Sequence, residues 1–526
     1  MSISLFERSA KFASRIALLA NGESRTYEWL EVHSRVRAGQ LLHGCADLEE
    51  ARIGFLMEPG LDYVATQWAI WRAGGIAVPL CPEHPDPELT YIIEDAGVSL
   101  LLASELLDEK LRPIARAQNL SYRSISGPGG EVSPEENKTI KLPILSLDRR
   151  AMILYTSGTT GRPKGAVSTH ANMIAHMESL VEAWNWDSQD HILHVLPLHH
   201  THGVVNALCC ALYSGATVEF SRPEATQCWD HFASGEVTVF MAVPTIYSKL
   251  LHAWEQADDF TRARWTKGAA KLRLMVSGSA ALPVSIFERW KAVTGHDLLE
   301  RYGMTEIGMG LSNPYAGERR PGTVGQPLPS VDLRIFNPES RKVLAEGLHA
   351  IEEGASGEIQ VRGPMVFSEY WGRPDDTAAS FEDGWFRTGD EAVLEEGYYR
   401  ILGRRSVDIL KSGGYKISAV EIEEVLRSHH AVQDCAVVGL PCEEWGERVA
   451  AAFVAEPGGS VLPPLVVKVL ERYCRTLLAP YKVPRAWLCV DELPRNAMGK
   501  IQKPAVQDLF AAHGKGSIEV SSWLVE

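Results

Sequence analysis

The chain has 526 residues, which is too many for a single hydrophobic core, so three or four structural units are expected. Its formal net charge of −15 disfavours nucleic acid and anionic membrane surfaces as partners, because both attract cationic patches. The nine cysteines contain no CxxC pair, and the adjacent Cys209 and Cys210 suit neither a structural zinc site nor a disulfide framework, so a reducing compartment is expected.

The N-terminus bears on the cellular compartment. Residues 4–18 are weakly amphipathic and carry three cations, Arg8, Lys11 and Arg15, as a short organellar presequence would. Glu7 interrupts this pattern, and the segment runs directly into apparent domain sequence. A cytoplasmic protein is therefore expected, with the mitochondrial matrix as the alternative. No apolar run approaches the ~20 residues that cross a bilayer, so no membrane span is expected.

Strand-like and helical segments alternate along most of the chain. Apolar strand-like runs occur at residues 53–56, 77–80, 100–102, 191–196, 216–220, 238–243 and 272–277. Helical stretches such as 62–73 separate them, and this alternation is typical of an α/β sheet. From 331 to 402, short strands with glycine turns predict a small β unit, and strand and helix alternate again after Arg404.

The sequence TSGTTGRPKG at residues 156–165 combines glycines, hydroxyls and two cations in one short turn. Glycines let backbone N–H groups approach a polyanion, and the Lys164 ammonium adds a donor that cannot repel it. A buried strand at 152–155 and a helix at 169–180 would place this loop at a helix N-terminus, where phosphate binds well. An ordinary surface turn is the alternative. Because Gly165 follows Lys164, the loop does not match the GxxxxGK[ST] pattern of P-loop NTPases.

Three later segments place charged side chains in short turns. The sequence ERYGMTE at 300–306 ends in Glu306, a carboxylate that suits Mg2+ bound to substrate phosphates. The sequence WFRTGD at 385–390 ends in Asp390, which could hold a ribose diol, and Lys500 follows a glycine in a polar loop. Taken singly, each segment is also compatible with a solvated surface turn.

Together and in this order, the segments resemble the adenylate-forming superfamily of acyl-CoA synthetases, luciferases and nonribosomal adenylation domains, over essentially the whole chain. The resemblance implies that Glu306 holds Mg2+, that Lys500 bridges the substrate carboxylate and the α-phosphate, and that Thr156 and Lys164 share the catalytic work. It implies ATP or AMP contacts by Thr156, Ser157, Gly158, Thr159, Thr160, Gly161, Lys164, Gly278, Ser279, Ala280, Glu300, Arg301, Tyr302, Gly303, Met304, Thr305, Asp390, Arg404 and Lys500.

The resemblance also implies an α/β fold in two parts. A large N-terminal adenylation domain, residues 1–402, would contain two α/β subdomains and a small β-barrel. A small mobile α+β C-terminal domain, residues 409–526, would follow a hinge at 403–408. The hinge reads GRRSVD, which is one residue longer than the G-R-x-[DK]-D pattern, so the pivot residue stays open.

Within the superfamily, the sequence is most similar to malonyl-CoA synthetases. The matching strings are LPLHHTHG at 196–203, LERYGMTE at 299–306, SNP at 312–314, GTVG at 322–325 and PRNAMGK at 494–500. The resemblance implies an acid-binding site of His200, His202, Ser277 and Arg301. The guanidinium of Arg301 would pair with the distal carboxylate of malonate, and a fatty acid would leave this cation buried and unpaired. The alternative is that Arg301 pairs internally with Glu300.

The implied reaction has two steps and uses ATP, Mg2+ and coenzyme A. The carboxylate attacks the α-phosphorus of ATP, and the resulting acyl-adenylate then passes its acyl group to the thiol of coenzyme A. For the second step, the C-terminal domain would swing about the hinge and bring Ser412, Gly413, Gly414, Tyr415 and Lys416 to the coenzyme A tunnel.

Other functions stay open on the sequence alone. A general short- or medium-chain acyl-CoA synthetase is one, and a nucleotide-binding pseudoenzyme is another, although it would not need Glu306, Asp390 and Lys500. An adenylation module serving a carrier protein is less favoured, because no carrier motif follows residue 500. Methylmalonate is a possible second substrate, and a monomer or a homodimer is expected.

Overall fold

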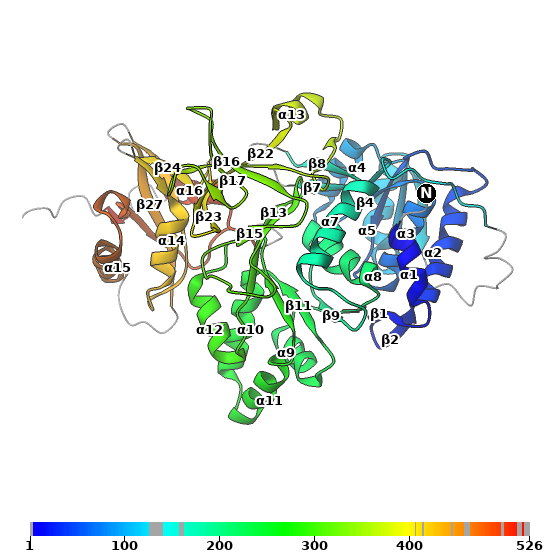
Figure 1. Cartoon of the computed structure of the whole chain (residues 1–526), viewed down its shortest axis with the longest axis horizontal. Helices are drawn as coiled ribbons and strands as arrows, with labels where there is room; N and C mark the ends of the chain where they lie inside the picture. The colour runs from blue at the N-terminus through cyan, green and yellow to red at the C-terminus, as the bar shows by residue number, and fades with distance from the viewer. Residues whose placement is uncertain are drawn as a thin grey trace, which may run out of the picture.

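The structure is a computed structural model, and it describes residues 4–125, 140–156, 162–405, 407–412, 415–442, 445–456, 463–495, 499–512 and 518–519. Figure 1 shows an elongated molecule, with the N-terminal α/β part at one end and the C-terminal segment at the other. Helices α9 to α12 project from the middle, below the strands that connect the two ends.

The first sheet has seven strands in the order β20-β8-β7-β4-β3-β5-β6. The pairs from β7 to β6 are parallel and β8 is antiparallel to β7. Burial on both faces explains the continuous apolar runs of the inner strands. The strands are β3 (Arg52–Leu56), β4 (Ile76–Pro79), β5 (Leu100–Ser104), β6 (Ser121–Ile125), β7 (Arg150–Thr156), β8 (Lys164–Thr169) and β20 (Glu369–Tyr370). The accompanying helices are α1 (Ser4–Ser9), α2 (Tyr27–Leu42), α3 (Leu61–Arg72), α4 (Asp86–Ala96), α5 (Asp108–Ala117) and α7 (His170–Ala183).

The second sheet has nine strands in the order β15-β14-β13-β12-β11-β9-β10-β1-β2. The central strands are parallel, and Ser277 pairs with Glu300 where β12 meets β13. The strands are β1 (Ile16–Ala20), β2 (Glu23–Thr26), β9 (His191–His194), β10 (Thr217–Phe220), β11 (Val239–Ala242), β12 (Leu274–Ser277), β13 (Leu299–Met304), β14 (Gly308–Ser312) and β15 (Gln326–Pro327). The helices are a π-helical segment (His202–Cys209), α8 (Cys210–Ser214), α9 (Ala225–Ser234), α10 (Pro244–Gln256), α11 (Asp259–Ala269) and α12 (Val284–Thr294).

The small β unit expected over residues 331–402 is a seven-stranded antiparallel sheet. Its order is β18-β17-β16-β19-β22-β21, with β23 also paired to β22. Long β22 carries Asp390 in its middle, opposite Arg404 of β23. The elements are β16 (Asp332–Asn337), β17 (Lys342–Glu346), β18 (His349–Ala350), β19 (Ser356–Arg362), α13 (Pro374–Ala379), β21 (Phe381–Glu382), β22 (Trp385–Glu395) and β23 (Tyr398–Arg404).

The chain after residue 408 forms a fourth sheet in the order β25-β24-β27-β28-β29, with β26 paired to β27. Two apolar clusters made only of residues after 408 give this part its own core. The elements are β24 (Ile409–Ser412), β25 (Tyr415–Ser418), α14 (Ala419–Arg427), β26 (Val432–Cys442), β27 (Gly446–Ala455), α15 (Pro463–Leu477), β28 (Ala486–Cys489), α16 (Lys503–Ala512) and β29 (Ile518–Glu519).

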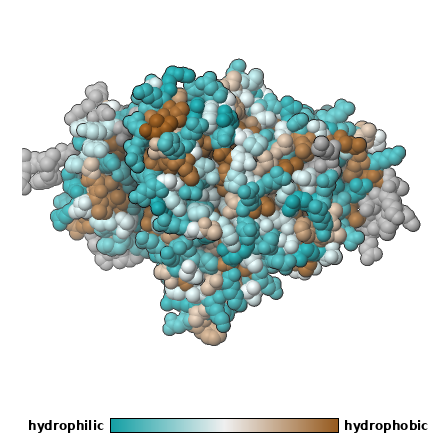
Figure 2. Space-filling view, viewed as in Figure 1, coloured by the Kyte–Doolittle hydropathy of each residue, from teal (hydrophilic) through white to brown (hydrophobic). Residues whose placement is uncertain are grey.

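The surface is mostly polar on the face shown in Figure 2, where small hydrophobic patches are separated by hydrophilic residues. Within the described residues, every helix falls short of the length and apolar character that a bilayer crossing requires.

Candidate active site

The glycine-rich loop lies at the tip of a β-hairpin. Strands β7 and β8 are antiparallel, with Thr156 opposite Lys164 at the loop end and Arg150 opposite Thr169 at the other end. Helix α7 begins only after Thr169, which caps it by accepting from the N–H of Asn172. The prediction that the loop sits at a helix N-terminus is therefore wrong, because β8 carries the chain away from the loop before the helix starts. Phosphate binding here would depend on the loop's own N–H groups and side chains.

Few contacts of the loop itself are described. Ser157, Gly158, Thr159, Thr160 and Gly161 lie outside the described residues. The Thr156 hydroxyl is 3.4 Å from the carbonyl oxygen of Lys164. The Lys164 ammonium lies 2.9 Å from the Asp376 carboxylate of α13 and faces the ring of Tyr370. Lys164 therefore has a half-exposed acidic partner, which a phosphate would have to displace or share.

Arg301 is the centre of the predicted acid-binding site, and it is 3% exposed. Its guanidinium makes one long contact, 3.5 Å, to the Ser279 hydroxyl, and its Nε has no hydrogen-bond partner. Burial lowers the pKa of Arg301 to about 9, and Glu300 opposes this shift only when its own carboxyl is ionised. The guanidinium nevertheless stays charged at neutral pH. A buried cation without an anionic partner carries an uncompensated desolvation cost, and an anionic ligand would offset that cost.

Several buried polar side chains near Arg301 or in the π-helical region lack partners. His176 and His202 lie close enough to Arg301 for its charge to lower their pKa, and Ser277 ends the strand beside β13. The unpartnered atoms are His176 Nε2, His202 Nε2 and Ser277 Oγ, together with Thr201 Oγ1 and both amide atoms of Asn206 in or next to the π-helical segment. Buried polar groups in proteins are nearly always hydrogen-bonded, so a concentration of unpaired ones indicates a polar ligand. His202 Nδ1 is 3.2 Å from Ser279 Oγ, which ties this histidine to the same turn as Arg301.

The histidines of this site are neutral. Burial and the Arg301 charge lower the pKa of His176 to about 3 and hold that of His202 well below its usual range. Burial lowers the pKa of His200 to about 4, and its ring packs on His199 with 4.1 Å between centroids. Neutral imidazoles can donate or accept hydrogen bonds without adding repulsion to the Arg301 cation.

Glu300 does not pair with Arg301. Neighbouring residues of a strand point to opposite faces. Glu300 therefore accepts from the Leu282 N–H at 2.9 Å and fixes the turn after β12. The predicted alternative, an internal Arg301–Glu300 ion pair, is not formed in the structure. Burial raises the pKa of Glu300 to about 8, so this carboxyl is largely protonated at neutral pH.

The turn after β12 is shaped around Arg301. A Cβ at Gly278 would lie 2.5 Å from Arg301 Cζ, so the absence of a side chain there leaves room for the guanidinium. Ser279 has a φ of +71°, a left-handed conformation that is uncommon for a non-glycine residue and often marks functional turns. Ala280 follows in the same turn, whereas Ser277 ends β12 and is fully buried.

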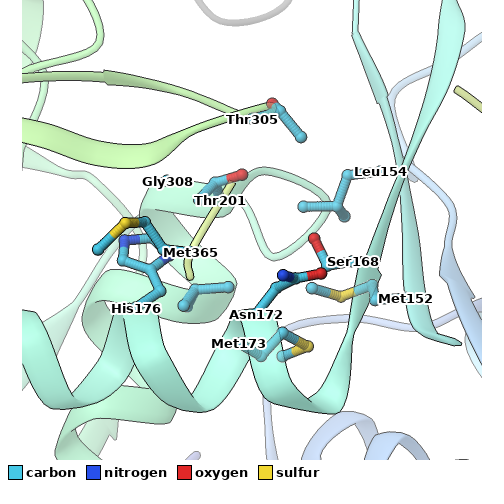
Figure 3. Close-up of a pocket in the computed structure, with 11 residues that line it drawn as sticks. Met152, Leu154, Ser168, Asn172, Met173, His176, Thr201, Thr305, Gly308 and Met365 are labelled. Carbon is cyan, nitrogen blue, oxygen red and sulfur yellow. The ribbon is translucent and has the colours of Figure 1, made fainter. Parts of the chain in front are cut away.

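Glu306 lies at the other end of the same motif. It is buried and accepts a hydrogen bond from the Tyr370 hydroxyl at 2.7 Å. Burial raises its pKa, and the Tyr370 hydrogen bond opposes that shift. Figure 3 shows Thr305 and Gly308 on one side of a small pocket whose other walls include residues of β7, β8 and α7 and Thr201. Gly303 and Met304 are the last residues of β13 and lead directly to Thr305 and Glu306.

Asp390 binds two partners from neighbouring elements. The Tyr302 hydroxyl donates to Oδ2 at 2.6 Å, and Arg404 Nε lies 3.1 Å from Oδ1. Arg404 also donates to the Thr388 carbonyl oxygen at 3.0 Å. The structure thus brings together Tyr302, Asp390 and Arg404, three residues predicted from separate motifs. Each carboxylate oxygen retains a lone pair for a diol.

The C-terminal part contacts the N-terminal part at the beginnings of α10 and α12. A Cβ at Gly499 would lie 3.5 Å from the Thr245 hydroxyl, so Gly499 packs against the first turn of α10. Glu424 of α14 accepts from the Val284 N–H at 3.2 Å. The exposed Lys500 also contributes to the lowered pKa of Asp408, behind the larger effect of Lys503.

The described ends of the predicted hinge are hydrogen-bonded to each other. Asp408 N–H donates to the Arg404 carbonyl oxygen at 2.7 Å, and Arg404 N–H donates back to Asp408 Oδ2 at 3.0 Å. Lys503 Nζ lies 2.6 Å from Asp408 and 2.8 Å from Glu423 in a buried cluster. The Arg404 side chain therefore contacts β22, whereas the Asp408 side chain contacts Lys503 of the C-terminal part.

The described residues of the predicted coenzyme A segment belong to β24 and β25 at one edge of the fourth sheet. Ser412 is buried at the end of β24, and Tyr415 is 53% exposed with its ring stacked on Tyr481 at 4.2 Å. Lys416 lies on β25, and Gly413 and Gly414 lie outside the described residues.

Sequence reasoning missed part of the polar lining. His176 lies on α7, and Thr201 and Asn206 lie in or next to the π-helical segment. His176 and Asn206 stand among mostly apolar neighbours in the sequence, so only their unpaired atoms in the fold identify them, whereas Thr201 lies within the LPLHHTHG string between His200 and His202. The π-helical geometry of residues 202–209, a feature often found at functional sites, is a further sign.

Curated relatives and solved structures resemble the chain over nearly its full length. It is 46% identical to the mitochondrial malonate–CoA ligase of Mus musculus, covering 95% of this chain and 90% of that protein. It is 39% identical to a malonate–CoA ligase of Arabidopsis thaliana, covering 95% and 86%. ATP-bound MatB from Rhodopseudomonas palustris superposes with a TM-score of 0.85 at 32% identity, covering 97% and 99%.

A malonyl-CoA ligase in a ternary product complex with methylmalonyl-CoA and AMP superposes with a TM-score of 0.66 at 37% identity, covering 92% and 97%. The model of the AMP-binding enzyme family matches residues 5–371, and that of the AMP-binding enzyme C-terminal domain matches residues 421–500. The chain therefore belongs to the AMP-binding enzyme family.

Proposed function

We propose that this protein is a malonate–CoA ligase. It joins malonate to coenzyme A through a malonyl-adenylate and releases AMP and pyrophosphate. The observation that carries the proposal is the buried Arg301 guanidinium, which forms no ion pair within the described part of the chain. The names of the mouse and Arabidopsis relatives support the same substrate.

The physical case depends on the second carboxylate of malonate. One carboxylate must reach the α-phosphorus of ATP, so the other would have to enter the protein. A charge-assisted hydrogen bond with Arg301 would contribute about 1.5–3 kcal/mol. Neutral His202 and the Ser277 hydroxyl are buried beside it and can donate to the remaining lone pairs. A fatty acid would leave all of these groups unpaired, which penalises it more than a size mismatch would.

Methylmalonate is the second substrate that we propose. A methylmalonyl-CoA product complex of a structural relative supports it, and the additional methyl group leaves both carboxylates in place.

Adenylation requires positioning and charge neutralisation. The carboxylate that attacks, the triphosphate and the departing pyrophosphate are all anionic, so cations and N–H donors lower the barrier. We assign this role to the residue 156–165 loop, Lys164 and Lys500. We assign Mg2+ binding to Glu306, whose carboxylate is buried. Mg2+ binds proteins through only one or two carboxylates, and it would neutralise phosphate charge. Asp390, positioned by Tyr302 and Arg404, is assigned to the ribose.

Thiol transfer requires a different arrangement of the C-terminal segment, because Lys500 would otherwise obstruct the adenylate. We propose a body of residues 1–402, a hinge of 403–408 and a lid of 409–526. The docking of Gly499 beside Thr245 supports an adenylation arrangement. The TM-scores agree with it: 0.85 to the ATP-bound relative against 0.66 to the product complex, although the latter is more similar in sequence. Rotation would then bring the residue 412–416 segment to coenzyme A.

A general short- or medium-chain acyl-CoA synthetase is the second candidate. It is favoured only if the pocket accepts acids that cannot pair with Arg301. The names of the vertebrate relatives support the mitochondrial alternative more than the cytoplasmic expectation. Whether the protein is a monomer or a homodimer stays a prediction.

The test is AMP release in the presence of ATP, Mg2+ and coenzyme A with acetate, malonate, methylmalonate, succinate or octanoate. Malonate should give the highest kcat/KM, with methylmalonate next and octanoate lowest. A preference for acetate or octanoate over malonate would favour the second candidate. Absence of AMP release with every acid, in a protein that binds ATP, would favour a pseudoenzyme.

A further inference from the structure

Three side chains with metal-binding atoms meet beside the acid-binding site. They are Cys81, His84 and His199, and their sulfur and nitrogen atoms all lie within 4.8 Å of one another. Cys81 and His84 belong to the loop between β4 and α4, whereas His199 belongs to the loop after β9. The cluster therefore joins two loops that are distant in the sequence.

The donor set suits a borderline-soft cation. Zinc is bound tetrahedrally by cysteine sulfur, histidine nitrogen and carboxylate oxygen, and CxxH is a spacing that places two of these on one turn. A fourth ligand is available, because Glu83 Oε2 lies 3.1 Å from Cys81 Sγ. Ligand atoms around a tetrahedral zinc ion lie roughly 3.5 Å apart. Side-chain rotations that move the ligand atoms by about an ångström would therefore complete the site.

Contacts within the protein do not account for the whole cluster. His84 Nε2 lies 3.6 Å from Glu88, and the rings of His84 and His199 meet edge to face at 5.8 Å. His84 Nδ1, however, is buried without a hydrogen-bond partner. This orphaned nitrogen is a ready ligand, because neutral imidazole binds metals through a free ring nitrogen.

The surrounding charges permit a dication. Two carboxylates, Glu83 and Glu88, face the histidines, and one cation, Lys110, lies nearby with its ammonium bonded to the Pro82 carbonyl. Loss of the thiol proton on metal binding would add a third negative charge. Together these charges would balance a divalent ion and the lysine.

We propose that Cys81, His84 and His199, with Glu83 as the fourth ligand, form a zinc-class metal site that clamps the β4–α4 loop to the loop after β9. On binding, the metal–sulfur bond replaces the S–H bond, and the proton leaves to solvent. The site is separate from that of Mg2+, a hard cation that prefers oxygen ligands and is assigned to Glu306. Because His199 packs on His200, the metal would also restrain one wall of the acid-binding site.

Co2+ is the probe that tests this site directly, because thiolate ligation gives it an intense near-ultraviolet charge-transfer band. The full chain, stripped of metal by a chelator, is titrated with Co2+ and then with Zn2+. We expect one Co2+ per chain with the thiolate band and the visible bands of tetrahedral cobalt, displaced by one equivalent of Zn2+. Zn2+ should also raise the midpoint of thermal unfolding.

Matched variants identify the ligands. Cys81→Ser should remove the thiolate band, and His199→Gln should weaken Co2+ binding by more than ~10-fold, since loss of outer-shell partners alone costs 10- to 100-fold. Cys45→Ser and His252→Gln change an exposed cysteine and an exposed histidine elsewhere, and both should leave the titration unchanged.

Two results would overturn the proposal. One is a wild-type protein that gives no thiolate band at saturating Co2+. The other is a Cys81→Ser variant that melts like wild type without metal and still binds Co2+ with the same spectrum and affinity. Neither readout uses malonate, ATP or coenzyme A, so failure of the metal site and failure of the proposed ligase activity are distinguishable.

Discussion

The Arg301 guanidinium packs against the α-carbon of Gly278, so closely that a methyl group on residue 278 would lie 2.5 Å from Arg301 Cζ. This contact links the turn after β12 to β13. It makes the position of the proposed acid-binding cation dependent on a residue that has no side chain.

Gly278→Ala should therefore displace Arg301 and weaken malonate binding. The φ of Gly278 does not require glycine, and the clash is with the end of a flexible side chain, so the fold should persist. Because a charge-assisted hydrogen bond contributes about 1.5–3 kcal/mol, the KM for malonate should rise at least ~10-fold. Steady-state kinetics measure this rise, and the KM for ATP should change little.

Gly310→Ala is the matched control, since its added Cβ would meet only the end of Ile307 at 3.4 Å. Equal malonate kinetics in the two variants would show that the Gly278 contact does not position Arg301.

Lys500→Ala should separate the two half-reactions. Only adenylation uses an ammonium between the carboxylate and the α-phosphate, and loss of such a donor costs about 100- to 1000-fold. Pyrophosphate exchange should fall by that factor. Thioester formation from preformed malonyl-adenylate and coenzyme A should stay near the wild-type rate. An equal loss of both rates in a folded variant would contradict the assigned role.

Glu306→Gln should weaken the use of Mg2+-ATP without unfolding the protein. Burial raises the pKa of this carboxyl, so a neutral amide of the same shape should not destabilise the fold. A hard cation requires the charge, and the Mg2+ concentration for half-maximal activity should rise at least ~10-fold. An unchanged Mg2+ dependence would show that Glu306 is structural.

Glu300→Gln tests the pH dependence of stability. Burial raises the pKa of Glu300 from 4.5 to about 8, so the folded chain keeps a proton that the unfolded chain releases. The free energy of unfolding contributed by this group must then fall as the pH rises between those two values. The Gln variant should lose less stability than wild type between about pH 5.5 and pH 8.

Thermal unfolding at the two pH values measures this difference. Glu236→Gln, which changes an exposed surface carboxylate, is the control. The same decline in wild type, Glu300→Gln and Glu236→Gln would contradict a buried protonated Glu300.

The sequence predicted the strands well where apolar runs were continuous, as at residues 152–155. It did not predict β8, because Lys164 to Thr169 contains small and polar residues and follows directly on the glycine loop. The helix expected from Thr169 does begin there, but on the far side of this additional strand. Local composition cannot show that a loop is the tip of a hairpin, since that depends on pairing with β7.

The site was predictable where its residues share a short motif. Arg301, Tyr302 and Glu306 come from one strand and its following turn, and their separate faces follow from strand alternation. His176 could not be predicted in the same way, because its place near Arg301 depends on the packing of α7 against the π-helical segment and β14. The same reason hides the Cys81–His84–His199 cluster, whose third ligand lies on another loop.

The central claim is that Arg301 binds the distal carboxylate of malonate, and kcat/KM of Arg301→Leu tests it most directly. Malonate kcat/KM should fall by more than the ~10- to 200-fold that hydrophobic size alone can discriminate. Butyrate should lose little or gain, and Arg301→Lys should restore malonate use only in part, because an ammonium cannot bind bidentately. If Arg301→Leu binds ATP normally and keeps malonate kcat/KM within about tenfold of wild type, the dicarboxylate assignment is contradicted.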